Sequence, residues 1–393
     1  MKKAINILFL AVVTLVLCVG GFCTLREKRT TLFYENRAVE PRPELSRAGL
    51  WSGAYFTQLD SFLSDRFVSR DDLIALDTQL DLALGRAVVH GVALGDGAIF
   101  PFHGFSTWST SYLARDAQSM ADRLAQVRDL AAAYGGRIYY VGVPQQYSYY
   151  QDKYPDYLDN RQWVLSEIHV QFSAALEERG ISFIDMDQRF DQLGRPDEFY
   201  SPTDHHYAYL GALETYGTLM DRINADTGWN LPVTTQEDLE LIDLPNPFLG
   251  SQNRKLYGLW PTDEALTIGC LKTPIPFTRT DNGADVEPSV YALPADPQKQ
   301  MNYSLYMGGD VAETVIQTGR PELPKCLIWG DSFTNALETV LWTSFDETRS
   351  LDLRYYTTKT LSEYIAEYQP DVIICLRDDT AYLDLNGPNG AIS

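Results

Sequence analysis

The sequence predicts an α/β fold, a three-layer sandwich in which helices cover both faces of a central, mainly parallel sheet. Two observations lead to this prediction. Short runs of almost continuous apolar residues, typical of strands buried on both faces, alternate along the chain with amphipathic helical segments. The composition, with 45% hydrophobic and 22% charged residues over 393 positions, is that of a globular chain long enough for one large domain or two ordinary ones.

The N-terminal segment is predicted to cross a membrane once. After two lysines, residues 4–25 are almost wholly apolar, and their length suits a hydrocarbon core about 30 Å thick. The run is longer than the apolar part of a cleaved signal peptide and does not end in a small-x-small site, so residues 1–25 are interpreted as an uncleaved anchor. Residues 26–50, rich in Arg, Glu and Pro, are predicted to form an extended juxtamembrane stalk.

Composition excludes several partners and sites. Asp and Glu outnumber Lys and Arg by 53 to 32, which gives a formal net charge of −21. A body this acidic repels phosphate backbones, so nucleic acid is not an expected partner. The acidic body also favours a single-pass membrane protein whose body lies outside the cytoplasm. The five cysteines include no CxxC pair, so neither a disulfide framework nor a zinc site is predicted, and no cofactor is expected.

Residues 51–393 are predicted to form the folded body. Helical spacing of leucines and aromatic residues predicts two helices between about 51 and 82, and residues 88–100 are predicted to be two strands around Gly95-Asp96-Gly97. The elements predicted after them are helix 119–134, strand 137–143, helix 164–179, strand 181–186, helix 207–224, strand 326–329, helix 334–341, strand 351–356, helix 361–368 and strand 372–376. Residues 225–320, with scattered prolines and short β-prone pieces, are predicted to be a β-rich insertion.

Two distant motifs suggest nucleophilic catalysis. Ser332 follows a predicted strand and precedes a predicted helix, which places its hydroxyl near free N–H groups that can stabilise an oxyanion. A serine needs a base that is oriented by a third group. Asp204 lies two residues before His206 at a loop-to-helix junction, and in an extended backbone both side chains point to one side. Asp204 would then orient His206, and His206 would reach Ser332.

Each motif also has a plainer interpretation. A Gly-Asp-Ser turn is common, and Thr203 or Asp204 is a suitable N-cap for the helix that follows. Asp204, His205 and His206 together offer metal ligands, but no further cluster has ligand spacing, so a metal site is not predicted. The remaining histidines lie beside the predicted hairpin or within a predicted helix: His90, His103 and His169.

Together the motifs resemble the DHHW protein family, relatives of the alginate O-acetylation proteins of the AlgJ and AlgX type in the SGNH-hydrolase-like superfamily. The resemblance extends over nearly the whole body and rests on Asp204-x-His206 before an aromatic residue and on Gly330-Asp331-Ser332-Phe333 at a strand end. Further matching pieces are Glu35-Asn36-Arg37 followed by Pro41, Gly95-Asp96-Gly97 through Phe100, Phe199-Tyr200, and Asp352-Leu353-Arg354-Tyr355-Tyr356. One departure is Tyr207, where the family name has Trp.

The resemblance implies an SGNH-hydrolase-like fold and roles for particular residues. Ser332 would be the nucleophile, His206 the base and Asp204 its orienting group. Arg354, Tyr355 and Phe333 become candidates for binding the oxyanion or the substrate. His205, Asp331 and Tyr207 are further site candidates. The asparagine that donates to the oxyanion in many SGNH esterases is not identifiable, which leaves the second oxyanion donor unassigned.

The function implied is that of a membrane-anchored, extracytoplasmic O-acetyltransferase. Ser332 would take an acyl group from a membrane-bound donor protein and pass it to a cell-surface or exported polysaccharide. Two alternatives stay open: a carbohydrate esterase that uses the same triad, and a non-catalytic envelope scaffold or glycan-binding protein. Four tryptophans are candidates for stacking on sugar rings: Trp51, Trp108, Trp163 and Trp260.

Overall fold

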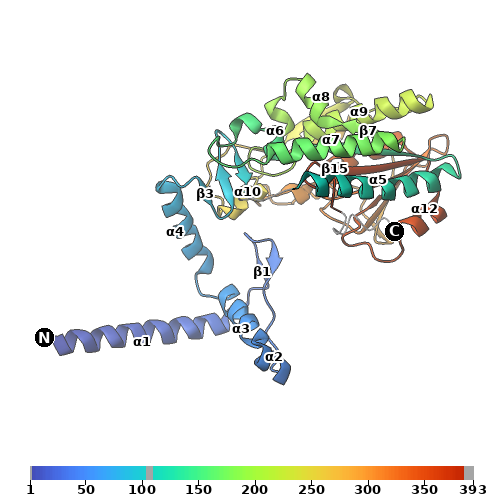
Figure 1. Cartoon of the computed structure of the whole chain (residues 1–393). Coiled ribbons are helices and arrows are strands. Elements are labelled where there is room, and N and C mark those ends of the chain that lie inside the picture. The colour runs from blue at the N-terminus through green and yellow to red at the C-terminus, as the bar shows by residue number, and fades with distance from the viewer. Residues whose placement is uncertain (1, 103–108, 385–393) are drawn as a thin grey trace. The chain divides into compact units, whose positions relative to one another are not determined.

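The computed structural model describes residues 2–102 and 109–384 (Figure 1). His103 and Trp108, both named from the sequence, lie outside the described residues. The chain divides into two compact units, residues 1–92 with 253–261, and residues 93–252 with 262–393. The early helices therefore belong to the N-terminal unit, whereas the sequence prediction grouped them with the body from residue 51 onward.

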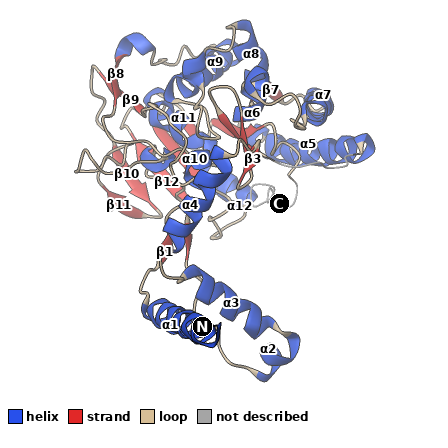
Figure 2. Ribbon diagram, turned by 90° about the vertical axis from the view of Figure 1, so that its left-hand side faces the viewer, coloured by secondary structure: helices blue, strands red, loops and turns tan. Residues whose placement is uncertain are grey.

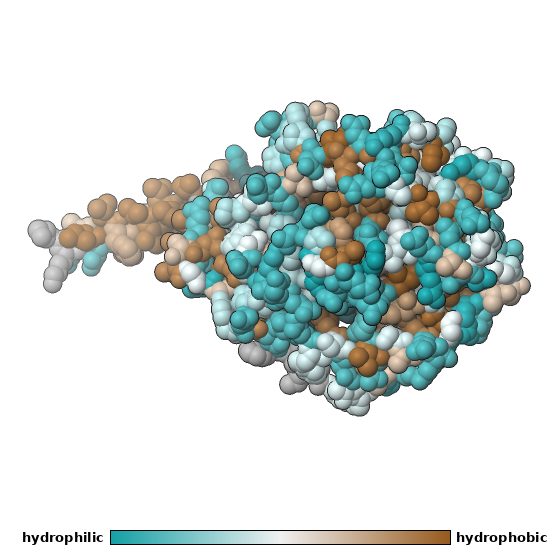
Figure 3. Space-filling view, turned by 90° about the horizontal axis from the view of Figure 1, so that it is seen from above, coloured by the Kyte–Doolittle hydropathy of each residue, from teal (hydrophilic) through white to brown (hydrophobic). Residues whose placement is uncertain are grey.

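The N-terminal unit begins with a long apolar helix, α1 (Lys2–Arg26). Residues Lys3–Arg26 are long and apolar enough to cross a membrane, a property that signal sequences share. Figure 3 shows that the surface of this helix is almost wholly hydrophobic, whereas the face of the body in view is mainly hydrophilic.

Residues 26–50 are not extended throughout, which corrects the predicted stalk. They contain an antiparallel hairpin of β1 (Thr31–Leu32) and β2 (Arg37–Ala38). The two terminal nitrogens of Arg37 donate to the buried carboxylate of Asp65 at 2.7 and 2.6 Å, and this fork fastens the hairpin to a helix. The other elements of this part of the chain are α2 (Arg47–Ser52), α3 (Ala54–Asp65), α4 (Arg70–Ala83) and β3 (Val88–Val89).

The second unit is built on an eight-stranded sheet of order β11-β10-β12-β14-β13-β15-β6-β7. Five neighbouring strands are parallel: β14 (Glu347–Leu351), β13 (Lys325–Gly330), β15 (Val372–Asp378), β6 (Arg137–Val143) and β7 (Ser182–Asp185). An antiparallel edge completes the sheet: β12 (Glu313–Gln317), β10 (Thr278–Asp281) and β11 (Ala284–Val286). The predicted mainly parallel sheet is confirmed.

Helices cover both faces of this sheet, as Figure 2 shows. Leu327 and Trp329 of β13 pack in one core with α5 (Thr110–Ala132), α7 (Gln162–Glu178) and α12 (Leu361–Tyr368). Alternate residues of a strand point to opposite faces, so Ile328 points to the other side, where α9 (Tyr209–Thr227) and α11 (Phe333–Leu341) pack. The three-layer α/β architecture predicted from the sequence is therefore confirmed.

Shorter elements lie outside the eight-stranded sheet. The predicted hairpin strands are present as β4 (Val92–Leu94) and β5 (Ile99–Pro101) on either side of the glycine turn. The remaining short elements are α6 (Gln146–Tyr149), η1 (Gln151–Lys153), α8 (Met186–Gln192), η2 (Asp197–Phe199), η3 (Gln236–Asp238), β8 (Leu239–Asp243), α10 (Ser251–Lys255), β9 (Thr267–Leu271), η4 (Tyr303–Leu305) and η5 (Trp342–Ser344).

Two predictions about strands need correction. The strand predicted at 351–356 ends at Leu351, because Asp352 closes a turn in which its carbonyl accepts the N–H groups of Tyr355 and Tyr356. Residues 225–320 do contain short strands, but they are not all separate from the central sheet. Strand β12 pairs with β14 and brings β10 and β11 with it, so part of this segment extends the sheet at its edge.

Candidate active site

Ser332 lies at the carboxyl end of a central strand, directly after β13 and before α11. The turn depends on Gly330, since a Cβ there would come within 2.4 Å of the Leu376 carbonyl oxygen on β15. Ser332 occupies the N-cap position of α11, but its side chain makes no capping hydrogen bond. The Ser332 hydroxyl therefore does not cap the helix.

The segment before α9 forms a tight turn closed by a bridge between Tyr200 and Tyr207. Within it, Ser201 Oγ accepts the N–H groups of Thr203 and Asp204, and Asp204 Oδ1 accepts the N–H of His206 at 3.1 Å. Asp204 and His206 thus meet through a side-chain turn rather than the extended backbone expected from the sequence. The N-cap of α9 is Ala208, so neither Thr203 nor Asp204 caps that helix.

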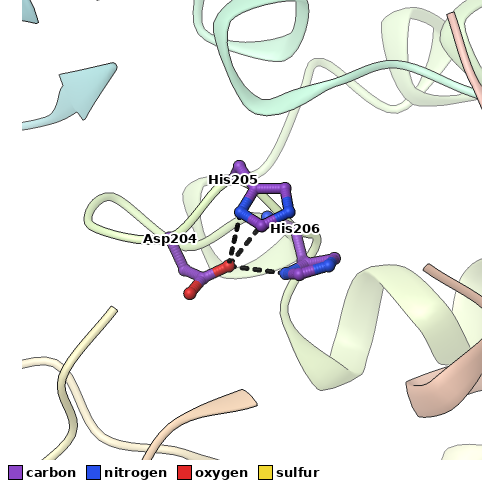
Figure 4. A group of neighbouring side chains, drawn as sticks. All are labelled: Asp204, His205 and His206. Atoms are coloured by element: carbon purple, nitrogen blue, oxygen red, sulfur yellow. Dashed lines mark hydrogen bonds and ion pairs between the residues drawn. The ribbon is translucent and has the colours of Figure 1, made fainter. Parts of the chain in front are cut away.

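Three side chains from these two segments form a continuous chain of hydrogen bonds. His206 Nδ1 lies 2.6 Å from Asp204 Oδ1, and His206 Nε2 lies 2.6 Å from Ser332 Oγ. Figure 4 shows both imidazole rings beside the Asp204 carboxylate. Asp204 is 2% exposed and His206 is 4% exposed, so solvent hardly competes for these contacts.

The buried carboxylate of Asp204 stays ionised because its surroundings are electropositive. Burial by itself raises its pKa, but the positive charge that His206 and His205 carry when they are protonated, the hydrogen bond of His206 and the amide of Ser251 lower it to well below its ordinary value. The Ser251 N–H donates to Asp204 Oδ2 at 2.6 Å. An ionised carboxylate accepts only, so the proton of the imidazole lies on Nδ1 and Nε2 presents its lone pair to the serine hydroxyl.

The amide groups at the start of α11 differ in their availability. The N–H of Phe333 donates to Asp331 Oδ1 at 3.0 Å, so this amide is already engaged. Among the described residues, the N–H of Ser332 donates to none of the backbone carbonyls of the turns and loops. It lies at the N-terminus of α11, which is the positive end of the helix dipole. Phe333 instead offers its ring, whose centre lies 4.8 Å from that of His206.

Other predicted site residues support this turn. Tyr207 is buried and its hydroxyl donates to the carbonyl of Phe333, which fixes the start of α11 against the Asp204 turn. Asp331 Oδ2 lies 3.8 Å from Nε of the buried Arg377 on β15. These contacts hold Ser332 from both sides, through one residue before it and one after it.

Arg354 pairs with two carboxylates, and the ring of Tyr355 is exposed. The guanidinium of Arg354 pairs with Asp352 at 2.5 Å and with Asp310 at 2.8 Å, and Asp310 in turn accepts from Asn335 of α11. The Tyr355 ring is 56% exposed. Within the described part of the chain, no hydrogen bond joins Arg354 or Tyr355 to Ser332.

His205 belongs to the same group of side chains. Its Nδ1 lies 2.7 Å from Ser251 Oγ and 3.5 Å from Asp204 Oδ1. The possible ligand atoms of Asp204, His205 and His206 all lie within 4.8 Å of one another, which is the geometry that a metal site would use. Each of these side chains also has a protein hydrogen-bond partner.

Three residues that line this group were not identified from the sequence. Ser251 holds Asp204, Glu264 accepts from Thr203 Oγ1 at 2.6 Å, and Tyr303 stacks on His206. All three lie in the segment 225–320, which has no motif around them. Only the length and irregularity of that segment marked it as more than a loop.

Of the tryptophans proposed to stack on sugars, Trp51 and Trp163 have exposed rings, and Trp260 is partly buried. No ring contact between these three and the residues of the candidate site occurs in the described ranges. They remain candidates for binding at the surface.

The comparisons with known proteins agree with this architecture. Residues 96–241 match the family model described as the SGNH hydrolase-like domain of the acetyltransferase AlgX. This range includes Asp204 and His206 but not Ser332. No curated protein matches the chain in sequence.

Several solved structures are similar in fold. Bacillus cereus PatB1 is 20% identical with a TM-score of 0.64, and the match covers 74% of this chain and 96% of PatB1. PatB1 carrying a sulfonyl adduct is 19% identical with a TM-score of 0.61, over 74% of this chain and 97% of that one. A DHHW family protein from Eubacterium siraeum is 18% identical with a TM-score of 0.57, over 78% and 95%. The resemblance noted in the sequence is thus confirmed: residues 96–241 match the AlgX family model, and the solved structures share the fold.

Proposed function

We propose that this protein is a membrane-anchored, extracytoplasmic O-acetyltransferase that uses Ser332, His206 and Asp204 to transfer an acetyl group to a polysaccharide. One observation carries the proposal: the hydrogen-bond chain from Asp204 through His206 to Ser332, with 2.6 Å at each step. A nucleophile, a base and an orienting carboxylate in this order are what acyl transfer through a serine requires.

The reaction has two halves. In the first, His206 Nε2 accepts the Ser332 hydroxyl proton while Oγ attacks the acyl carbonyl of the donor. The resulting oxyanion is stabilised by the Ser332 N–H at the start of α11, and its collapse releases the donor's leaving group, which takes the proton from His206. In the second, an acceptor hydroxyl gives its proton to His206 and attacks the acyl-serine. The bond between Ser332 Oγ and the acyl group then breaks, Oγ takes the proton back from His206, and the acceptor leaves as the new ester.

Asp204 stays ionised throughout both halves. Its carboxylate keeps the Nδ1 proton in place and balances the positive charge that His206 acquires when it takes the serine proton. Because Asp204 and His206 are buried, this pairing acts in a medium of low polarity, where it is stronger than in water.

The description of the matching family model supports transfer over hydrolysis, and the N-terminal helix supports anchoring. The acceptor we propose is a cell-surface or exported polysaccharide, and the donor is a membrane-bound acyl-donor protein. An anchored body would stay at the membrane surface, where both a membrane donor and an exported glycan pass.

The test uses the full chain in detergent with a small acetyl ester. We expect a rapid first turnover and a peptide containing Ser332 that carries one acetyl group, detected by mass spectrometry. Ser332→Ala removes both signals, whereas the surface variant Ser173→Ala leaves them unchanged. Equal ester turnover by wild type and Ser332→Ala would refute the proposed chemistry and favour a binding role.

A second measurement separates transfer from hydrolysis, since both pass through the same acyl-serine. Oligosaccharides with free hydroxyls are added to the acylated chain, and the products are analysed. Acetylated oligosaccharide supports the transferase. Free acetate at a rate that the oligosaccharide does not change would support the esterase instead.

A further inference from the structure

The imidazole of His206 is covered by an aromatic ring from a distant part of the chain. Tyr303 lies in η4, and its ring centre is 3.9 Å from that of His206 with an angle of 7° between the two planes. The other rings beside His206 are inclined to it, at 38° for His205 and 57° for Phe333. Among these three neighbours, only Tyr303 presents a full parallel face.

Tyr303 is itself held firmly. Asn302 caps the short helix by accepting the N–H of Ser304 at 3.0 Å, and the ring of Tyr306 packs against Tyr303 edge-on at 5.0 Å. Tyr303 is 7% exposed. A ring fixed in this way restricts how far the imidazole of His206 can tilt.

The hydroxyl of Tyr303 takes no visible part in this arrangement. It is buried and has no hydrogen-bond partner among the described residues. Burial raises the pKa of the phenol well above its ordinary value, so it stays neutral. The contact of Tyr303 with His206 is therefore made by the aromatic face.

We propose that Tyr303 is a positioning residue for the base: its ring sets the plane of His206 and stabilises the imidazolium that forms when the Ser332 proton is taken. The inference rests on the proposed function, because it needs His206 to act as the base. An aromatic face attracts a cation above it, and the effect is strongest where water is excluded. A neutral imidazole gains less, so the ring favours the transition state over the ground state.

Tyr303 lies in the segment 225–320, which therefore contributes to the site. The same segment supplies the Ser251 amide to Asp204 and the Glu264 carboxyl to Thr203. The segment 225–320, which does not follow the alternation of strands and helices, thus lines one side of the site.

The experiment compares two substitutions of Tyr303 in the full chain. Tyr303→Phe keeps the face and loses only the unpartnered hydroxyl. Tyr303→Leu removes the face while staying apolar. The matched control, Tyr364→Leu, removes a buried tyrosine ring of α12 that contacts Tyr356 and Tyr368. Each variant is reacted with a small sulfonyl fluoride and with an acetyl ester, and its thermal unfolding is recorded.

Tyr303→Phe is expected to match wild type in the rates of Ser332 sulfonylation and acetylation. Tyr303→Leu is expected to slow both about tenfold with an unchanged KM for the ester. Tyr364→Leu is expected to lower the unfolding temperature without slowing either reaction.

Two results would overturn the inference while the proposed function stands: wild-type rates in a folded Tyr303→Leu, or a loss in Tyr303→Phe as large as that in Tyr303→Leu. The reaction rate of Ser332→Ala distinguishes failure of the proposed function from failure of the role assigned to Tyr303. If this variant reacts as fast as wild type, Ser332 is not the nucleophile and the role assigned to Tyr303 falls with it.

Discussion

Replacing Asp204 by Asn tests whether the buried carboxylate, rather than its shape alone, makes Ser332 reactive. The carboxylate accepts three hydrogen bonds: from His206 N–H at 3.1 Å, from His206 Nδ1–H at 2.6 Å, and from Ser251 N–H at 2.6 Å. The Ser251 bond goes to one oxygen and the two His206 bonds to the other. An asparagine of the same shape has only one oxygen, so it cannot accept on both sides.

Both orientations of the new amide are unfavourable. With its oxygen towards His206, the NH₂ group faces the N–H of Ser251, and two donors meet in a buried place. With its oxygen towards Ser251, the NH₂ group faces His206, which moves the imidazole proton to Nε2 and removes the lone pair that Ser332 needs. We expect the acylation rate to fall about 10³–10⁴-fold, or about 4–5.5 kcal/mol of transition-state stabilisation. We also expect a loss of about 1–3 kcal/mol in the free energy of unfolding.

The assay is the first turnover of an acetyl ester by the full chain, followed in a stopped-flow instrument, with urea unfolding as the check on folding. Ser251→Ala is the control, since it keeps the backbone N–H to Asp204 and loses only the hydroxyl, which contacts the backbone N–H and the Nδ1 of His205. Its rate is expected to stay within about tenfold of wild type. A folded Asp204→Asn that keeps more than about a tenth of the wild-type rate would refute the reasoning.

Three further predictions follow from the same region. Gly330→Ala places a Cβ within 2.4 Å of the Leu376 oxygen, so it is expected to lower the free energy of unfolding, measured by thermal unfolding, by about 1–3 kcal/mol. Gly217→Ala lies in an open helical position and is expected to be neutral or stabilising. Equal effects of the two substitutions would contradict this reasoning. Burial raises the pKa of Glu264 from 4.5 to about 7, so its stabilising contribution is full below pH 4.5 and is lost as the pH rises through 7. The free energy of unfolding measured in urea should therefore fall by up to about 3 kcal/mol over this pH range relative to that of Glu264→Gln. If the unfolding free energies of wild type and Glu264→Gln depend on pH in the same way, the raised pKa of Glu264 is contradicted. Tyr355→Ala is expected to change the ester rate by less than about twofold, because the ring is exposed and makes no hydrogen bond to Ser332 among the described residues; a tenfold loss would support a role for it in binding the oxyanion or the substrate.

Much of the fold could be predicted because its signals are local. The strand 137–143 and the helix 361–368 were predicted with the bounds that the structure gives them, β6 and α12. Continuous apolar runs indicate strands buried on both faces, and this pattern depends only on neighbouring residues. The prediction of a strand at 351–356 was wrong because Asp352 closes a turn. The hydrogen bonds of that turn outweigh the β preference of the tyrosines that follow it.

The edge of the sheet was less predictable. Residues 313–317 carry no signal that distinguishes pairing with β14 from forming a separate sheet. Their antiparallel partner is supplied by residues 347–351, and the choice depends on which edge of the sheet is still unpaired. The hairpin in residues 26–50 is similar, since it is fastened by Asp65 of a later helix.

The sequence alone determined the α/β class, the apolar N-terminal helix, and which serine, histidine and aspartate were worth bringing together, because residue type and short spacing specify these features. Only the tertiary structure decided that His206 and Ser332, 126 residues apart, come within 2.6 Å. It also decided that Ser251, Glu264 and Tyr303 surround them. Such contacts arise when separate segments meet at the carboxyl edge of one sheet, and no local pattern encodes that meeting.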